Sequence, residues 1–241
     1  GVERAVFFGV LTRVWQLLAG PVNLLLVARY LTPEMQGFFF TFASLLALQS
    51  FVELALYLDI INTASHEWAF LSLDNIGRIV GEPNAHSRLV SLGRLVFKWY
   101  SVVSGLFVIG VWTAGYIFYS QKPHPDIFWQ APWLVLVFLT GLQLWALPFN
   151  SLLEGCNQVA TIQKFRFSQA ILSTLASWLA YVLGMGLWVA VVAAIVAVLR
   201  DGYLLGVQYR NFFRAFFQPP SGPIINWQTE ILPMQWRLAL S

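Results

Sequence analysis

The amino-acid sequence predicts an all-α membrane protein, a polytopic bundle of six transmembrane helices with a cytoplasmic N-terminus. Of the 241 residues, 58% are hydrophobic and only 10% are charged, whereas soluble domains carry about 25% charged residues. The mean hydropathy is +0.67. Aromatic residues make up 16% of the chain and include 11 tryptophans, as is typical of proteins with aromatic belts at the membrane interfaces. So little charge predicts burial in a lipid bilayer.

Six segments are apolar over the length that a membrane span requires, about 20 residues for a hydrocarbon core about 30 Å thick. They are residues 5–28, 38–61, 95–119, 131–153, 165–184 and 187–208. We therefore expect a six-helix transmembrane lobe over residues 1–214. Residues 215–241 are expected to form a linker and the truncated start of a second lobe, because an apolar-leaning stretch begins near Ile231.

The first span carries polar residues on one face. Four of its residues follow helical spacing, at intervals of three, four and three: Arg13, Gln16, Gly20 and Asn23. Pro21 removes a backbone hydrogen bond, so a kink is expected there. Polar groups at membrane depth usually face a bundle interior or a water-filled cavity, which makes Arg13, Gln16 and Asn23 candidates for substrate binding. Snorkelling of Arg13 to the cytoplasmic headgroups is the alternative, and both interpretations stay open.

The second span carries Gln49 and Glu53, one helical turn apart. This span runs from the outside to the cytoplasm, so Glu53 is expected in its cytoplasmic half, near the depth of Arg13. A buried carboxylate needs a partner or takes up a proton. We therefore expect an Arg13–Glu53 ion pair, and Gln49 is a further candidate for substrate binding. A purely structural ion pair and a role for Glu53 in ion coupling both stay open.

The connection that leads to the third span, residues 65–94, spaces basic residues among apolar ones. It predicts either a surface helix that runs into the third span or an ordinary solvated connector. The fourth span carries Gln143 and Asn150, seven residues apart, as candidates for the wall of a polar cavity. Hydrogen bonds between helices are the alternative role of such amides.

The fifth and sixth spans are joined by the sequence GMG at 184–186, which predicts a tight hairpin on the outer side. Gln169 in the fifth span is a further cavity candidate. The sixth span contains Arg200 and Asp201. Adjacent positions on a helix do not face each other, so these side chains are expected to have separate partners. Anchoring at the headgroups and lining of a cavity both stay open for them.

The distribution of basic residues predicts the orientation, because cytoplasmic loops are enriched in Lys and Arg. One side of the predicted bundle holds Arg4, Arg78, Arg88, Arg94, Lys98, Lys164, Arg166, Arg210 and Arg214. The opposite side holds only Arg29 and Lys122. The N-terminus and the end of the sixth span are therefore expected in the cytoplasm.

Several function classes are not supported by the sequence. The formal net charge of +3 comes from scattered basic residues rather than from a basic stripe, so no nucleic-acid partner is expected. Cys156 is the only cysteine and the three histidines are far apart, which predicts no metal site. The phosphate-binding, hydrolase and zinc-protease signatures are missing. We expect neither enzymatic activity nor a cofactor.

Two stretches resemble a known family. Residues 30–56, YLTPEMQGFFFTFASLLALQSFVELAL, and residues 153–169, LEGCNQVATIQKFRFSQ, are similar to Wzx-type polysaccharide flippases of the multidrug/oligosaccharidyl-lipid/polysaccharide exporter superfamily. The resemblance implies a two-lobed fold of about twelve to fourteen helices, with this chain as its N-terminal lobe. It also implies a bent first helix that lines a central cavity, where arginines meet the pyrophosphate of an undecaprenyl-linked oligosaccharide. Arg13 lies where such an arginine is expected.

The resemblance further implies that the chain flips a lipid-linked oligosaccharide across the bacterial inner membrane by alternating access, for surface polysaccharides such as lipopolysaccharide O-antigen. Arg13 would bind the pyrophosphate, and Glu53 would couple transport to a proton or a sodium ion. The sugar hydroxyls would be contacted by Gln16, Asn23 and Gln49. The expected partners are the lipid-linked substrate, the bilayer and other polysaccharide-assembly proteins.

Two alternatives stay open. A cation- or proton-coupled multidrug exporter of the same superfamily predicts several acidic residues in the cavity, and Glu53 is the only clearly deep one. A membrane glycan polymerase or ligase predicts a large outer loop with catalytic residues.

Overall fold

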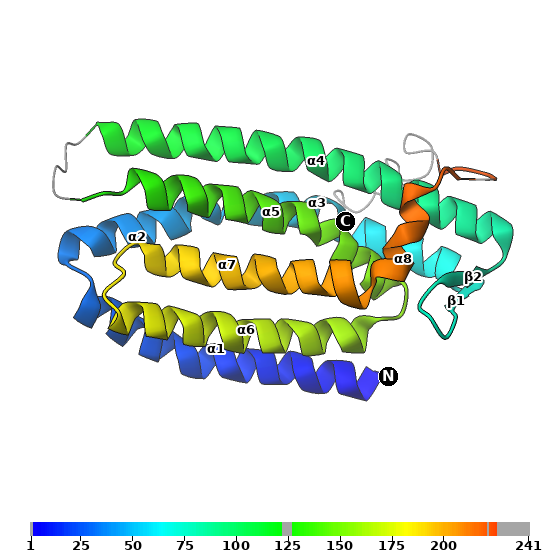
Figure 1. Cartoon of the computed structure of the whole chain (residues 1–241), viewed down its shortest axis with the longest axis horizontal. Helices are drawn as coiled ribbons and strands as arrows, with labels where there is room; N and C mark the ends of the chain where they lie inside the picture. Colours follow the sequence, from blue (N-terminus) through cyan, green and yellow to red (C-terminus); the bar gives the residue numbers. More distant parts are fainter. Residues whose placement is uncertain (1, 122–126, 221, 226–241) are drawn as a thin grey trace, which may run out of the picture.

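The computed structural model describes residues 2–121, 127–220 and 222–225, with side chains described for all of these except residues 2 and 51–56. The helices lie side by side along one long axis (Figure 1). They are α1 (Val2–Tyr30), α2 (Pro33–Leu46), α3 (Gln49–Trp68), α4 (Pro83–Ser120), α5 (Gln130–Gly155), α6 (Val159–Val182), α7 (Trp188–Tyr203) and the short α8 (Arg210–Arg214). A small antiparallel hairpin of β1 (Leu71–Leu73) and β2 (Ile79–Gly81) precedes α4. The predicted all-α class is confirmed for the described residues.

Four of the described helical stretches are long and apolar enough to cross a membrane, which indicates a membrane protein. They are Glu3–Tyr30, Pro83–Ser120, Gln130–Gly155 and Trp188–Gln208. The last extends α7 through a π-helical turn, Leu204–Gln208. α2 has 14 residues, fewer than the about 20 that a complete span needs. The count of six spans and the cytoplasmic N-terminus stay predictions.

α5 is the central helix of the bundle. It packs against α3, α4, α6 and α7, and 56% of its most apolar stretch is buried. Trp133 of α5, Tyr100 of α4 and Phe42 of α2 are among the largest fully buried side chains. α1 packs mainly on α6, and only 11% of its most apolar stretch is buried. Most of the α1 surface is therefore left exposed by the described residues.

The second predicted span, residues 38–61, is not one continuous helix. The chain forms two helices, α2 and α3, which meet at Ala47 and Leu48. Both residues keep a right-handed helical conformation, but the backbone N–H of Leu48 donates to the carbonyl of Leu45, three residues earlier, and Ser50 donates to Ala47 in the same way. This tightening to 3₁₀ geometry interrupts the α-helix.

α1 runs without interruption through Gly20 and Pro21. The proline ring removes the N–H donor that would bond to the carbonyl of Leu17, and both Pro21 and Leu17 are exposed. The helix is thus continuous at this position, and the kink expected there stays a prediction.

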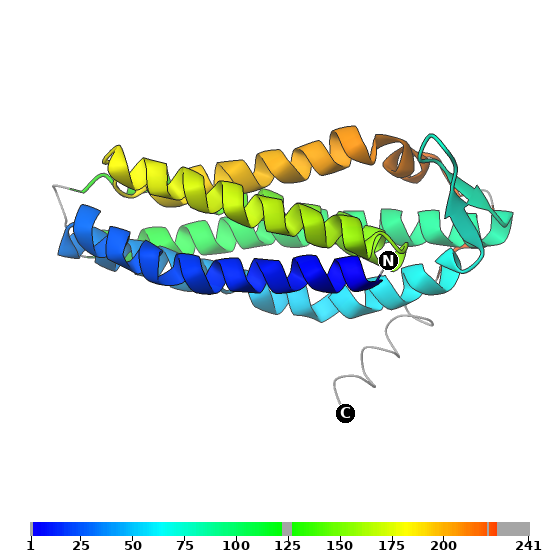
Figure 2. The same cartoon turned by 90° about the horizontal axis from the view of Figure 1, so that it is seen from below.

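In the connection over residues 65–94, residues 83–94 are helical and run into the third predicted span as part of α4. α3 leads directly into the hairpin, and α4 begins right after it and runs unbroken for 38 residues. Asp74 closes the hairpin turn, since its Oδ1 accepts the backbone N–H groups of Ile76 at 3.0 Å and Arg78 at 2.7 Å. A helix of this length extends about 57 Å, which exceeds the ~30 Å hydrocarbon core. In Figures 1 and 2 its first turns and the hairpin extend past the N-terminal end of α1.

The segment after α7 folds back over α4. Its aromatic residues Phe212, Phe213 and Phe216 are buried. Gly93 of α4 makes room for Phe216, because a Cβ atom at Gly93 would lie 2.2 Å from Cδ1 of that ring. Farther along, the Ser91 hydroxyl accepts the backbone N–H of Ile225 at 2.9 Å. The described part of residues 215–225 thus packs against α4.

Candidate functional site

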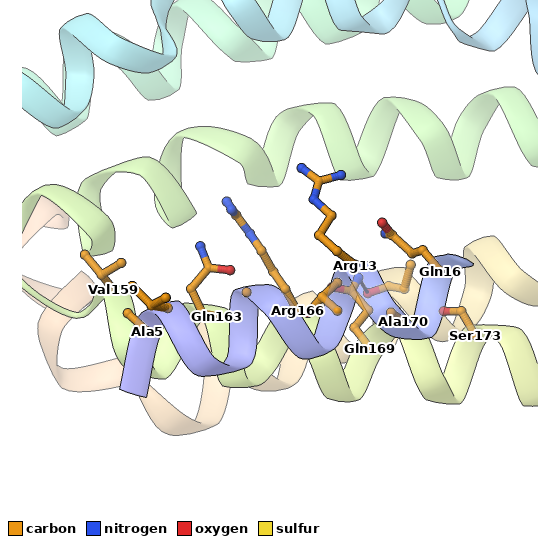
Figure 3. Close-up of a pocket in the computed structure, with 13 residues that line it drawn as sticks. Ala5, Arg13, Gln16, Val159, Gln163, Arg166, Gln169, Ala170 and Ser173 are labelled. Atoms are coloured by element: carbon orange, nitrogen blue, oxygen red, sulfur yellow. Dashed lines mark hydrogen bonds between the residues drawn. The ribbon is translucent and has the colours of Figure 1, made fainter. Parts of the chain in front are cut away.

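A cavity of about 760 Å³ lies between α1, α6 and α7 (Figure 3). Its wall consists of Ala5, Val6, Gly9, Thr12, Arg13, Gln16, Val159, Gln163, Arg166, Gln169, Ala170, Ser173 and Ala197. The charged members are two arginines, and none of the described lining residues is acidic. We refer to this hollow as the Arg13 cavity.

Helical spacing gathers the polar part of this wall. On α6, the positions of Gln163, Arg166 and Ser173 are separated by three and seven residues, so they share one helical face. On α1, Arg13 and Gln16 are one turn apart. Because α1 packs along α6, these two faces border the same cavity.

Arg13 and Arg166 supply the positive charge of the cavity. Figure 3 shows both side chains extending to the same side of the α1–α6 pair, with Gln163 and Gln16 beside them. Among the side chains that the structure describes, no carboxylate forms an ion pair with Arg13. The expected Arg13–Glu53 pair involves the side chain of Glu53, which lies outside the described residues.

A buried carboxylate holds Arg166 in place. The Nη2 atom of Arg166 lies 2.5 Å from Oε1 of Glu154, which belongs to the last turn of α5 and is 7% exposed. Tyr57 of α3 donates its hydroxyl to Oε2 of the same carboxylate. An ionised carboxylate this far from water needs such partners. The three residues therefore connect α3, α5 and α6 and fix Arg166 in the cavity wall.

A second buried carboxylate, Asp201 of α7, lies behind the wall. The side chains of Asn150 and Gln169 lie close to it, and Gln169 itself lines the cavity. Arg200 has a different partner, since its Nη2 donates to Oγ of Ser168 at 2.5 Å. Arg200 and Asp201 thus have separate partners, as adjacent helical positions require.

Asn23 lies farther along α1 and contacts α6. Its Oδ1 accepts the indole N–H of Trp178 at 2.7 Å, a hydrogen bond between two helices. A neighbouring hollow of about 770 Å³ surrounds Gly20 and Pro21, and both Gln16 and Asn23 line it. Gln16 therefore belongs to two hollows, whereas Asn23 belongs only to the second.

The remaining amides do not join Arg13. Neither Gln49 nor Gln143 lines the Arg13 cavity. Gln49 is the first residue of α3, at the interruption, and its buried Oε1 has no hydrogen-bond partner in the described part of the chain. Gln143 is half-buried in α5. Of the predicted site residues, Arg13 and Gln16 meet at the cavity, and Asn150 and Asp201 connect to it through Gln169.

Sequence reasoning did not propose Arg166, Glu154 or Tyr57 as site residues. A signal for the ion pair was present, because Glu154 is the only acidic residue between Asp126 and Asp201. It stands at the end of a span, and Arg166 follows across a short connection. When two consecutive helices pack against each other, residues on either side of their connection come close together. No comparable signal exists for Tyr57, which comes from a distant part of the sequence.

No group of three His, Cys, Asp or Glu side chains gathers at one place in the described ranges. The chain matches no protein-family model, and neither a curated protein nor a solved structure matches it.

Proposed function

We propose that this chain is a membrane lobe of a flippase for a lipid-linked oligosaccharide, with an undecaprenyl pyrophosphate carrier as the anionic part of the substrate. The observation that supports this proposal is the wall of the Arg13 cavity, which carries two guanidinium groups and, among the described side chains, no acidic one. Glu154 is the counter-charge of Arg166, whereas Arg13 has no ion-pair partner among the described side chains. A cation at membrane depth is costly without a counter-charge. An anionic ligand is therefore the class of ligand that this wall favours.

The chemistry of the wall suits a pyrophosphate linked to sugars. Guanidinium groups bind phosphate oxygens in a bidentate manner, and Arg13 and Arg166 both extend into the same space (Figure 3). Gln16, Gln163 and Ser173 add amide and hydroxyl groups that donate to and accept from sugar hydroxyls. The Glu154 carboxylate approaches Arg166 from the side of α5, so it orients Arg166 without joining the cavity wall.

In this proposal six segments cross the inner membrane of a bacterium, with α2 and α3 together forming one crossing and the N-terminus in the cytoplasm. The face of α1 that carries Arg13 and Gln16 would face a second lobe, and the cavity would open alternately to the two sides. Glu53 would link this cycle to a proton or a sodium ion. The partners would be the bilayer, the lipid-linked substrate and other proteins of surface polysaccharide assembly.

Replacement of Arg13 tests the proposal. In cells that depend on this protein for surface glycan, we expect Arg13→Ala to reduce the glycan about tenfold or more, because charge-assisted hydrogen bonds are worth about 1.5–3 kcal/mol. Arg13→Lys keeps the charge and loses the bidentate geometry, so an intermediate level is expected. The matched control is Arg29→Ala, near the other end of α1. Wild-type glycan in Arg13→Ala at normal protein level would exclude the proposed role of Arg13.

A cation exporter is the second candidate, because Glu154 and Asp201 are two buried carboxylates close to the cavity. Both already have polar partners in the structure, which favours the flippase. Drug-efflux measurements on Asp201→Asn distinguish the two proposals. If the protein is an exporter, cells with Asp201→Asn lose resistance to cationic drugs. If it is a flippase, cells with the variant and cells with the wild-type protein have the same drug resistance.

A further inference from the structure

The opposite side of α6 carries a second groove that shares no residue with the Arg13 cavity. Its volume is about 670 Å³, and α1, α6, α7 and the π-helical turn line it. Its charged residues are Arg4, Lys164 and Arg200, and no acidic residue lines it. These cations come from the end of the bundle where α1 begins and α7 ends (Figure 1). We refer to this groove as the Arg200 groove.

Arg200 is held in a fixed orientation within this groove. Its guanidinium carbon lies 4.7 Å from the centroid of the Phe165 ring, and its Nη2 donates to Ser168. Its Nε is buried and has no hydrogen-bond partner within the described part of the chain. A guanidinium held in this way presents its charge to the groove in a fixed orientation, which suits an anion.

The cations of the groove have no direct ion-pair partner among the described residues, although Asp201 interacts electrostatically with Arg200. No carboxylate of the described residues forms an ion pair with Arg4, Lys164 or Arg200. Several cations of one sign around a groove create a positive potential that attracts anions. The charge therefore favours a phosphate-bearing ligand.

Exposed apolar side chains continue from the groove along two helices. On α6 they follow Lys164 and Ser168 at helical spacing: Leu172, Leu175 and Leu179. On α1 the exposed residues Val14 and Leu18 follow Phe7, which lines the groove. From Ser168 to Leu179 the α6 stripe extends about 16 Å, about half of the ~30 Å hydrocarbon core. That length fits the acyl chains of one leaflet.

We propose that the Arg200 groove binds the headgroup of an anionic phospholipid of the bilayer, whose acyl chains lie along the stripes of α1 and α6. The phosphate oxygens accept hydrogen bonds from Arg200, Lys164 and Arg4, and the chains cover the exposed leucines. A free phosphate ion offers the same headgroup chemistry but leaves the stripes uncovered, so the lipid is the favoured source. The site does not rest on the proposed transport function.

Native mass spectrometry of the purified protein, released from nanodiscs that mix phosphatidylglycerol with phosphatidylcholine, tests this proposal. We expect the wild-type protein to retain phosphatidylglycerol in preference to phosphatidylcholine. Each cation near an anionic surface contributes about fivefold in affinity. The double variant Lys164→Gln/Arg200→Gln is therefore expected to lose most of that preference. The matched control is Arg94→Gln/Lys98→Gln, two exposed cations of α4.

Arg200 also packs on Phe165, so its replacement removes a packing contact as well as a charge. A second variant that keeps Arg200 therefore separates loss of lipid binding from loss of folding. Arg4→Gln/Lys164→Gln changes only exposed residues, and it is expected to lower the preference in the same direction. Addition of inorganic phosphate distinguishes a bound phospholipid from a bound phosphate ion, since a lipid anchored by its acyl chains stays bound. Unchanged preference in both groove variants, an equal loss in the control, or full release of phosphatidylglycerol by inorganic phosphate would overturn the proposal.

Discussion

At the scale of single residues, the Glu154–Arg166 ion pair holds the Arg166 side chain in the wall of the Arg13 cavity. The carboxylate is buried and the guanidinium is about one-third exposed, with side-chain exposures of 6% and 35%. The pair therefore has one side anchored in the bundle and one side facing the cavity. Removal of one partner of a buried pair leaves the other charge uncompensated, which is more damaging than removal of both.

We expect Glu154→Gln to lower the free energy of unfolding by about 3 kcal/mol, because Arg166 then loses its buried counter-charge. The measurement is denaturant unfolding of the purified protein in detergent. The double variant Glu154→Gln/Arg166→Gln is expected to be more stable than the single one. Tyr57→Phe removes only the hydroxyl donor to Glu154, so a smaller loss of about 1–2 kcal/mol is expected. If Glu154→Gln were as stable as the wild type, the pair would have no structural role.

At the scale of elements, the contact between α4 and the segment after α7 depends on one glycine. Gly93 faces the ring of Phe216, and no side chain fits between them. The ring of Phe216 thus lies directly against the α4 backbone at this position, which lacks a Cβ atom. At Gly105, on the same helix, a Cβ atom would meet no neighbouring atom within 4 Å, which makes this glycine a suitable control.

We expect Gly93→Ala to destabilise the protein by about 1–3 kcal/mol through overpacking against Phe216. Gly105→Ala is expected to be neutral or to stabilise by up to about 1 kcal/mol, because alanine favours the helix over glycine. Thermal unfolding of both variants in the same detergent measures the difference. Equal stability of the two variants would show that the close contact at Phe216 does not limit the packing.

The interruption between α2 and α3 also belongs to this scale. An α-helix normally breaks at Pro or Gly, yet Ala47 and Leu48 are neither. The sequence places its Gly-Pro pair at residues 20 and 21, where α1 stays helical. The sequence did not indicate the interruption at Ala47 and Leu48, because hydropathy and residue type do not report a change from i→i+4 to i→i+3 hydrogen bonding.

At the scale of the whole molecule, the crossing pattern can be tested with single cysteines. The native Cys156 is buried, and burial raises the pKa of its thiol, so little reactive thiolate is present at neutral pH. Labelling with a membrane-impermeant maleimide therefore starts from a low background. Ile76 in the hairpin turn and Met185 between α6 and α7 are exposed positions for new cysteines.

We expect Met185→Cys to be labelled in intact cells and Ile76→Cys only after the cells are permeabilised. The reason is that an odd number of predicted crossings separates the two positions. The unmodified protein, with Cys156 alone, is the control for background labelling. Labelling of both cysteines from the same side would contradict the six-crossing pattern with a cytoplasmic N-terminus.

The sequence predicted the helical membrane class and part of the site. Arg13 and Gln16 stood out because polar residues are rare in a long apolar run, and both line the cavity. Partners drawn from different helices could not be found in this way. Asn23 bonds to Trp178, 155 residues away, and Tyr57 bonds to Glu154, 97 residues away. Such pairs depend on how the helices pack, which a single sequence does not reveal.

The length of α4 has a mechanical consequence. About 27 Å of this helix exceeds the hydrocarbon core, if about 30 Å of its 57 Å is embedded. The helix is unbroken over its 38 residues, so the β1–β2 hairpin is attached to one end of a rigid lever. A tilt of about 10° within the membrane would carry the far end of this lever through about 5 Å. A movement among the membrane helices thus becomes a larger displacement at the hairpin.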